Sequence, residues 1–171
     1  DFAAQVQAEH SAIVQALRFA LPRASLLDRI TGGSLQRFQP GDLLGIVPQG
    51  SSVPRYYSLA SGRSDGFVEI VVRKHPGGLC SGQLLDLSVG QTVRCFVKLN
   101  SGFQADRSDA PLILVGAGTG IGPLAGMIRA NKGRRPIHLW FGARHPQADF
   151  LYRADLDLWS ASGQLDRKST R

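Results

Sequence analysis

Residues 110–128 carry no charged side chain over 19 consecutive positions. That length would allow a membrane-spanning helix, and the glycines within it repeat the GxxxG spacing of such helices. Five glycines and Pro123 interrupt the stretch, however, and it begins with a continuous apolar run at 111–115. Such a run, followed by a glycine turn, is typical of a strand buried on both faces of a parallel sheet. We therefore reject the membrane span and predict a strand, a turn at 116–123 and a helix over 124–130.

A second apolar strand, at residues 136–141, follows that helix, so this part of the chain predicts a β-α-β unit. The earlier part differs, because about six short strands alternate with turn residues, which predicts a small antiparallel barrel. The polar segment 106–109 separates the two patterns. We predict one domain over 1–106 and an α/β domain over 110–171. The strands expected in the first domain are 2–10, 13–21, 43–47, 55–60, 67–74 and 91–99, with a short helix at 81–86.

The net charge of +7 narrows the classes of partner. It suits nucleic acid, an anionic membrane, a phosphorylated cofactor or an acidic protein. No run of five basic residues occurs and aromatic residues are not interleaved with them, so we place a phosphorylated cofactor above nucleic acid. Cys80 and Cys95 fit neither a metal-binding spacing nor a disulfide scaffold, and the four histidines are scattered. A reducing, cytoplasmic compartment is the expectation.

Four consecutive residues, Arg55, Tyr56, Tyr57 and Ser58, place a cation, two aromatic rings and a hydroxyl in one predicted strand. Because side chains alternate along a strand, Arg55 and Tyr57 share one face. A guanidinium can bind a pyrophosphate through two parallel hydrogen bonds, and a phenol ring beside it offers a surface for a flat cofactor ring. The alternative is an ordinary strand with a surface arginine and two packing tyrosines.

Two further places can bind anions. The segment Gly77-Gly78-Leu79-Cys80-Ser81 opens the predicted short helix, where backbone amides and a hydroxyl gather. The alternative there is a plain cap, in which Ser81 satisfies the helix amides. The strand over 136–141 is followed by Arg144 rather than by an acid, which favours NADP over NAD. Equally, Arg144 could be an ordinary surface arginine.

Four motifs occur in a fixed order: Arg55-x-Tyr57-Ser58, Gly78-Leu79-Cys80-Ser81, the glycine turn at 116–123, and Phe141-Gly142-Ala143-Arg144. With them, the chain resembles the ferredoxin–NADP⁺ reductase superfamily over roughly residues 40–165. It is most similar to the diflavin branch, which includes cytochrome P450 reductase and the sulfite reductase flavoprotein.

The resemblance implies a role for each motif. Arg55 would bind the FAD pyrophosphate, Tyr57 would stack on the isoalloxazine ring, and Ser58 would act catalytically beside flavin N5, where hydride arrives. The other positions implied to bind FAD are Tyr56, Val71, Val72, Arg73, Gly78, Leu79, Cys80 and Ser81. Those implied to bind NADP(H) are Gly118, Thr119, Gly120 and Arg144. No metal site is implied.

The chain also departs from the diflavin pattern. It has no room for the large helical insert of those enzymes, and it ends before their Ser-Arg and Tyr-x-Gln elements and their terminal aromatic residue. We therefore expect the nucleotide-binding domain to be incomplete at its C-terminal end.

The function that the resemblance implies is transfer of hydride from NADPH to FAD, and then of single electrons to a protein acceptor. The acceptor would be a flavodoxin-like FMN domain, a ferredoxin or a haem protein, with no nucleic acid and no membrane span in this chain. The protein would lie in the cytoplasm, or on the cytoplasmic face of a membrane if fused to an anchor. One alternative is an NADH-dependent flavin reductase or oxygenase reductase component on the same fold. Another is a non-enzymatic basic binding module.

Overall fold

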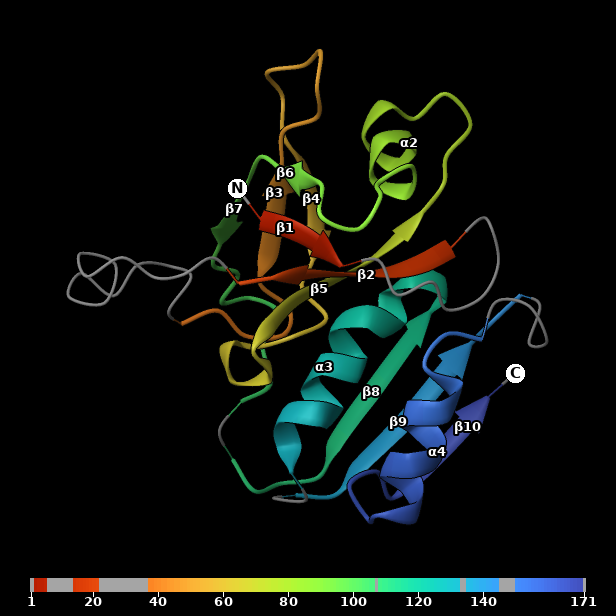
Figure 1. Cartoon of the computed structure of the whole chain (residues 1–171). Helices are drawn as coiled ribbons and strands as arrows, with labels where there is room; N and C mark the ends of the chain where they lie inside the picture. The colour runs from red at the N-terminus through yellow and green to blue at the C-terminus, as the bar shows by residue number, and fades with distance from the viewer. Residues whose placement is uncertain are drawn as a thin grey trace.

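The computed structural model describes residues 2–5, 14–21, 37–106, 108–132, 135–144 and 150–170. Two antiparallel sheets come first along the chain, and a parallel sheet with two helices follows (Figure 1). The predicted order of an antiparallel half and an α/β half is therefore confirmed. The expected loop at 22–33 and most of the first expected strand lie outside the described residues.

The first antiparallel sheet has the order β5-β2-β1-β6. Strands β2 (Val14–Ala20) and β5 (Phe67–Arg73) pair along their whole length. In β5 the residues Val68, Ile70 and Val72 point to one side and are fully buried, as alternation along a strand requires. The remaining strands are β1 (Phe2–Gln5) and β6 (Thr92–Val93).

The second sheet has the order β4-β3-β7, so β4 (Arg55–Ser58) is an edge strand. Its neighbours are β3 (Leu43–Ile46) and β7 (Cys95–Lys98). The single strand predicted over 91–99 is wrong, because β6 and β7 are two strands in different sheets with Arg94 between them. A chain that changes sheet in this way forms a corner between two packed layers.

The predicted closure into a barrel is not seen among the described strand pairs. The two sheets are connected by one isolated bridge, between Leu59 and Ile70. The space between them is a packed core that includes Leu17, Phe38 and Leu44, and helix α2 (Leu79–Leu85) contributes Leu84 to it. The antiparallel half is thus two sheets around one core, with α2 at one end.

The second half begins with β8 (Leu112–Ala117), the 3-10 turn η3 (Gly118–Gly120) and α3 (Ile121–Asn131). The strand and helix predicted for the uncharged stretch are confirmed, and no helix among the described residues is long and apolar enough to cross a membrane. The chain continues through β9 (Ile137–Gly142), α4 (Arg153–Ala161) and β10 (Arg167–Thr170). The sheet is parallel, with the order β10-β9-β8.

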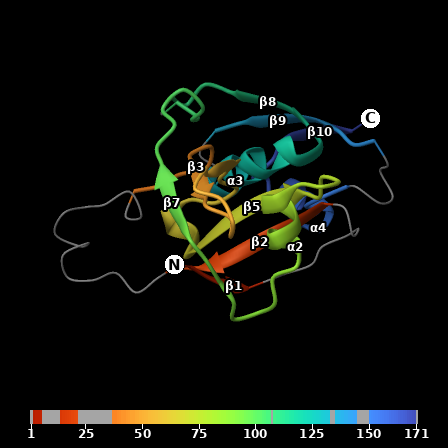
Figure 2. The ribbon, with the colours of Figure 1, turned by 90° about the horizontal axis from the view of Figure 1, so that it is seen from above.

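The prediction that the strand at 111–115, now β8, is buried on both faces is wrong. Both helices, α3 and α4, lie on the face of the sheet that is turned toward the antiparallel half (Figures 1 and 2). On the other face, Ile113 is 63% exposed, Val115 72% and Trp140 39%. A strand with one exposed face reads in sequence like a strand buried on both faces when the residues on its two faces are all apolar.

Candidate functional site

A cavity of about 560 Å³ lies beside α2, where the edge strands β4 and β5 separate. The two strands meet at the Leu59–Ile70 bridge and diverge from there toward α2 (Figure 1). The cavity brings together ten of the fifteen predicted site residues: Arg55, Tyr56, Tyr57, Val71, Arg73, Gly78, Leu79, Cys80, Ser81 and Thr119. Segments distant in sequence therefore converge on one volume, whose size is that of a small-molecule or cofactor site.

Two guanidinium groups reach this cavity. Arg55 is exposed, and its Nη1 makes only long contacts with the carbonyls of Val53 (3.3 Å) and Pro54 (3.4 Å). Among the described residues, its other nitrogens have no acceptor. Arg73 ends β5 and lies against the glycine turn, because a Cβ on Gly118 would be 3.3 Å from its Nη2. The pair can therefore bind a phosphate group without first breaking a strong internal bond.

Tyr57 is half-buried, and its hydroxyl lies near the thiol of Cys80 on α2. Burial, reinforced by the neighbouring thiol, raises the pKa of Tyr57 well above its usual range. Burial also raises the pKa of the Cys80 thiol. Both groups are therefore neutral at physiological pH. The Tyr57 ring lines the cavity and offers a surface on which a flat ring can stack.

The start of α2 presents backbone amides to the cavity. Ser81 does not cap the helix as the plain alternative supposed, because its hydroxyl accepts from the His75 amide (3.2 Å) and donates to the Gly78 carbonyl (3.3 Å). No described residue accepts a hydrogen bond from the amides of Leu79, Cys80 or Ser81. A side chain at 78 would crowd this arrangement, since a Cβ there would lie 2.6 Å from Ser81 Oγ and 3.1 Å from the His75 carbonyl oxygen. Together with the two arginines, these amides can donate hydrogen bonds to a bound anion.

The glycine turn reaches the same cavity through Thr119, in η3. Gly118 has a φ of +56°, in the left-handed region that favours glycine. A Cβ on Gly116 would lie 2.7 Å from Leu124 Cδ1, so a side chain there would require the Leu124 side chain on α3 to shift. The turn expected to bind one cofactor therefore borders the cavity expected to bind the other.

Five predicted residues do not line the cavity. Val72 is fully buried in the core, on the opposite side of β5. Ser58 is half-buried at the end of β4, where it pairs with Leu43. Gly118 and Gly120 flank Thr119 in the turn, and Arg144 is exposed just after β9. The roles of all fifteen residues stay predictions, whether or not the residue lines the cavity.

Three residues that sequence reasoning did not select also line the cavity: Pro48, His75 and Gly77. His75 and Gly77 could have been found from their position between Arg73 and the start of α2. Pro48 follows β3, and nothing local in the sequence marks it.

A second cavity, of about 460 Å³, lies on the other side of α2 and shares Pro48 and Cys80 with the first. Its polar lining consists mostly of neutral residue types, with one acidic residue, Asp86, and one basic residue, Arg94. A negative charge and a single arginine suit a pyrophosphate less well than two arginines and free amides.

Comparisons with known protein families match both halves of the chain. The oxidoreductase FAD-binding domain family matches residues 4–97, and the oxidoreductase NAD-binding domain family matches residues 114–169. The chain belongs to the ferredoxin–NADP⁺ reductase-like superfamily. Every residue predicted to bind FAD lies in the first match. The glycine turn and Arg144 lie in the second.

Among curated relatives, the chain is 33% identical over 154 residues to NADPH-dependent diflavin oxidoreductase 1 of Kluyveromyces lactis, which covers 85% of this chain and 24% of that protein. It is 34% identical over 145 residues to the toluate 1,2-dioxygenase electron transfer component of Pseudomonas putida, covering 81% and 43%. The chain thus spans less than half the length of these relatives. The crystal structure of an Amycolatopsis cytochrome P450 reductase superposes with a TM-score of 0.75 at 25% identity, covering 99% of this chain and 50% of that one.

Proposed function

We propose that this chain is the flavin-binding part of a reductase that takes hydride from NADPH onto FAD and passes single electrons to a protein acceptor. The observation that carries the proposal is the single cavity in which Arg55, Arg73, the Tyr57 ring and the amides of α2 meet Thr119 of the glycine turn. Hydride transfer requires two cofactors in contact, and this cavity is bordered by the predicted contact residues of both.

The donor set of the cavity fits FAD. The guanidinium of Arg55 and the backbone amides in the first turn of α2 would hold the pyrophosphate. The Tyr57 ring would support the isoalloxazine. Once bound, FAD accepts a hydride and releases electrons one at a time. The residues of the chain bind and orient it, and Ser58 is proposed to contact its reactive nitrogen.

NADPH is the proposed donor, with Gly118, Thr119 and Gly120 as its contacts and Arg144 near its 2′-phosphate. The curated diflavin oxidoreductases are described as NADPH-dependent, which supports this choice. The similarity to the toluate dioxygenase electron transfer component favours the alternative, an oxygenase reductase component that uses NADH. The nicotinamide preference separates the two.

The proposed acceptor is an acidic one-electron carrier, such as a flavodoxin-like FMN domain, a ferredoxin or a haem protein. Phe96 and Lys98 on β7, and Arg94 directly before it, are exposed, and Phe96 contacts Tyr56 edge-on with 6.1 Å between ring centroids. Lys98 Nζ lies 5.4 Å from the centroid of the Tyr56 ring. Exposed aromatic rings flanked by cations suit an acidic partner. Both cysteines are free thiols, consistent with the proposed cytoplasmic location.

Anaerobic stopped-flow spectroscopy on the FAD-loaded chain tests the proposal. The flavin absorbance should bleach on mixing with NADPH, faster than with NADH at equal concentration, and ferricyanide should restore it. Faster bleaching by NADH would favour the oxygenase-component alternative. A chain that binds no FAD would contradict both versions and favour a non-enzymatic module.

A further inference from the structure

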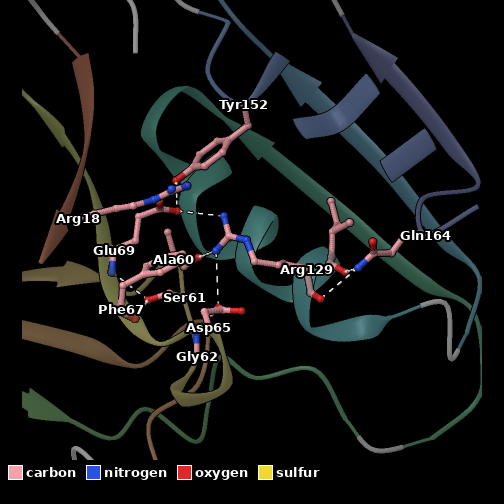
Figure 3. Close-up of polar contacts among 11 residues, drawn as sticks. Arg18, Ala60, Ser61, Gly62, Asp65, Phe67, Glu69, Arg129, Tyr152 and Gln164 are labelled. Carbon is pink, nitrogen blue, oxygen red and sulfur yellow. Dashed lines mark hydrogen bonds and ion pairs between the residues drawn. The ribbon is translucent and has the colours of Figure 1, made fainter. Parts of the chain in front are cut away.

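Glu69 is a fully buried carboxylate in the middle of β5, a strand otherwise rich in valine and isoleucine. Its Oε1 accepts hydrogen bonds from the Tyr152 hydroxyl (2.8 Å) and from Arg129 Nη2 (3.2 Å), and its Oε2 is paired with Arg18 Nε (Figure 3). A buried carboxylate is costly unless it is paired and hydrogen-bonded. This one is satisfied by three donors, which together with Glu69 we call the Glu69 cluster.

The donors of the Glu69 cluster come from both halves of the molecule. Arg18 lies in β2, Arg129 in the last turn of α3, and Tyr152 directly before α4. Arg129 also donates to the carbonyl of Ala60 (3.1 Å) and lies 3.6 Å from Asp65 Oδ2. The C-terminal end of α3 is therefore tied to the antiparallel half by one planar guanidinium with several acceptors.

The rest of α3 follows β5 at close range. Side chains of Glu69, Val71 and Arg73 share one face of β5. Arg73 lies against Gly118, and a Cβ on Gly122 would be 2.9 Å from Val71 Cγ2. The contacts at 69, 71 and 73 thus run from the end of α3 back to the glycine turn.

Gly126 lies between these contacts. A Cβ there would be 2.5 Å from the Ala60 carbonyl oxygen. Gly122 and Gly126 are four residues apart on α3, so they share one face of the helix, and Gly118 precedes them in the turn η3. The GxxxG spacing in the uncharged stretch therefore serves contact between the two halves.

We propose that Glu69 and Arg129 are positioning residues that hold the glycine turn, and with it Thr119, in register with the flavin cavity. The inference rests on the proposed function, because it assigns the cluster a part in hydride transfer. Helix α3 has 11 residues and is about 16 Å long, so a tilt of about 10° shifts one end against the other by about 3 Å. The contacts at the glycines are apolar or steric, so they include no polar bond that resists such a tilt. The polar bonds that resist it are those of the Glu69 cluster, at the end of α3 opposite Thr119.

Misplacement of reacting groups by about 1 Å can lower a rate by roughly a hundredfold. Loss of the cluster should therefore slow hydride transfer at saturating nicotinamide. FAD affinity should stay unchanged, since no cluster residue lines the cavity. A role limited to overall stability would not separate these two quantities.

The test uses three variants of the full chain, Arg129→Met, Arg129→Lys and Tyr152→Phe. Arg63→Met, which changes an exposed arginine outside the cavity, is the matched control. Spin labels at Val89→Cys and Leu158→Cys, both exposed and in different halves, report the distance distribution between the halves without any cofactor. The native Cys80 and Cys95 thiols have raised pKa values because they are buried, so they label slowly at pH 7. FAD affinity and flavin reduction at saturating NADPH are measured on the unlabelled variants.

We expect Arg129→Met to broaden the distance distribution and to slow flavin reduction by tenfold or more, with the FAD Kd within twofold of wild type. Arg129→Lys should recover part of the rate, because an ammonium keeps the ion pair with Glu69 but lacks the planar fork. Tyr152→Phe should also broaden the distance distribution and slow flavin reduction, but by less than Arg129→Met. Arg63→Met should match wild type.

A folded Arg129→Met with an unchanged distribution would overturn the proposal, as would a broadened distribution with an unchanged reduction rate. A parallel loss of FAD affinity would place the effect in the flavin site instead. If Arg129→Met does not fold, Arg129→Lys and Tyr152→Phe decide by the same criteria. If wild type takes up no FAD, the proposed function fails, and with it the part in hydride transfer. The cofactor-free distance distribution then still shows whether the cluster fixes the two halves.

Discussion

Replacement of Arg55 by alanine should weaken FAD binding strongly while leaving the fold intact. A hydrogen bond to a charged group contributes about 1.5–3 kcal/mol, and each 1.4 kcal/mol corresponds to about tenfold in Kd. We therefore expect the FAD Kd to rise by about tenfold to a hundredfold. Stability should change by less than about 0.5 kcal/mol, since Arg55 is exposed and makes only two long backbone contacts.

Quenching of FAD fluorescence on titration with protein gives the Kd, and urea melts of the cofactor-free chain give the stability. Arg55→Lys should lie between wild type and Arg55→Ala, because an ammonium keeps the charge but loses the two parallel bonds. Arg63→Ala removes an exposed arginine outside the cavity and should bind FAD like wild type. Wild-type affinity in Arg55→Ala, or an equal loss in Arg63→Ala, would refute the assignment of Arg55 to the pyrophosphate.

Three further predictions address other parts of the molecule. Ser58→Ala should retain FAD, but the flavin should be reduced about tenfold more slowly in stopped flow, because the variant loses one transition-state contact of about 1.4 kcal/mol. An unchanged rate would remove Ser58 from the mechanism. Gly126→Ala should destabilise the chain by about 1–3 kcal/mol in urea melts, since the added Cβ meets the Ala60 carbonyl at 2.5 Å, whereas Gly82→Ala has open space and should not. Burial raises the pKa of Cys95 from about 9 to about 12, so between these pH values the unfolded chain releases a proton that the folded chain retains. Stability should therefore fall from pH 9 to 11 by up to about 1.4 kcal/mol per unit, and by less in Cys95→Ala.

The cavity could be predicted from sequence largely because its residues occur in short, contiguous motifs. Arg55 and Tyr57 are two positions apart on one strand, and residues 78–81 form a glycine-led helix start, so local geometry suffices to place each set. Their convergence with Thr119 depends on contacts between segments that are far apart in the sequence, such as the contact of Arg73 with Gly118. The resemblance to a family supplied that step, where local patterns could not.

Features that depend on long-range packing escaped prediction. The change of sheet at Arg94 leaves no sequence signal, because the alternation continues through it. The exposed face of β8 carries Ile113 and Val115, aliphatic residues that look the same as core positions. Glu69 did carry a signal, a lone carboxylate in an apolar strand. Its meaning became clear only when Arg129 and Tyr152 were seen to meet it.

The central claim is that FAD binds in the cavity between β4, β5 and α2, and amide NMR of the 18.4 kDa chain tests it most directly. On titration with FAD, the amides of Leu79, Cys80 and Ser81 should shift most, as they have no acceptor within the described chain. The Arg55 side chain and the Thr119 amide should follow, with saturation at one FAD per chain. Shifts concentrated around the second cavity, at Asp86 and Arg94, with the α2 amides unmoved, would contradict the account.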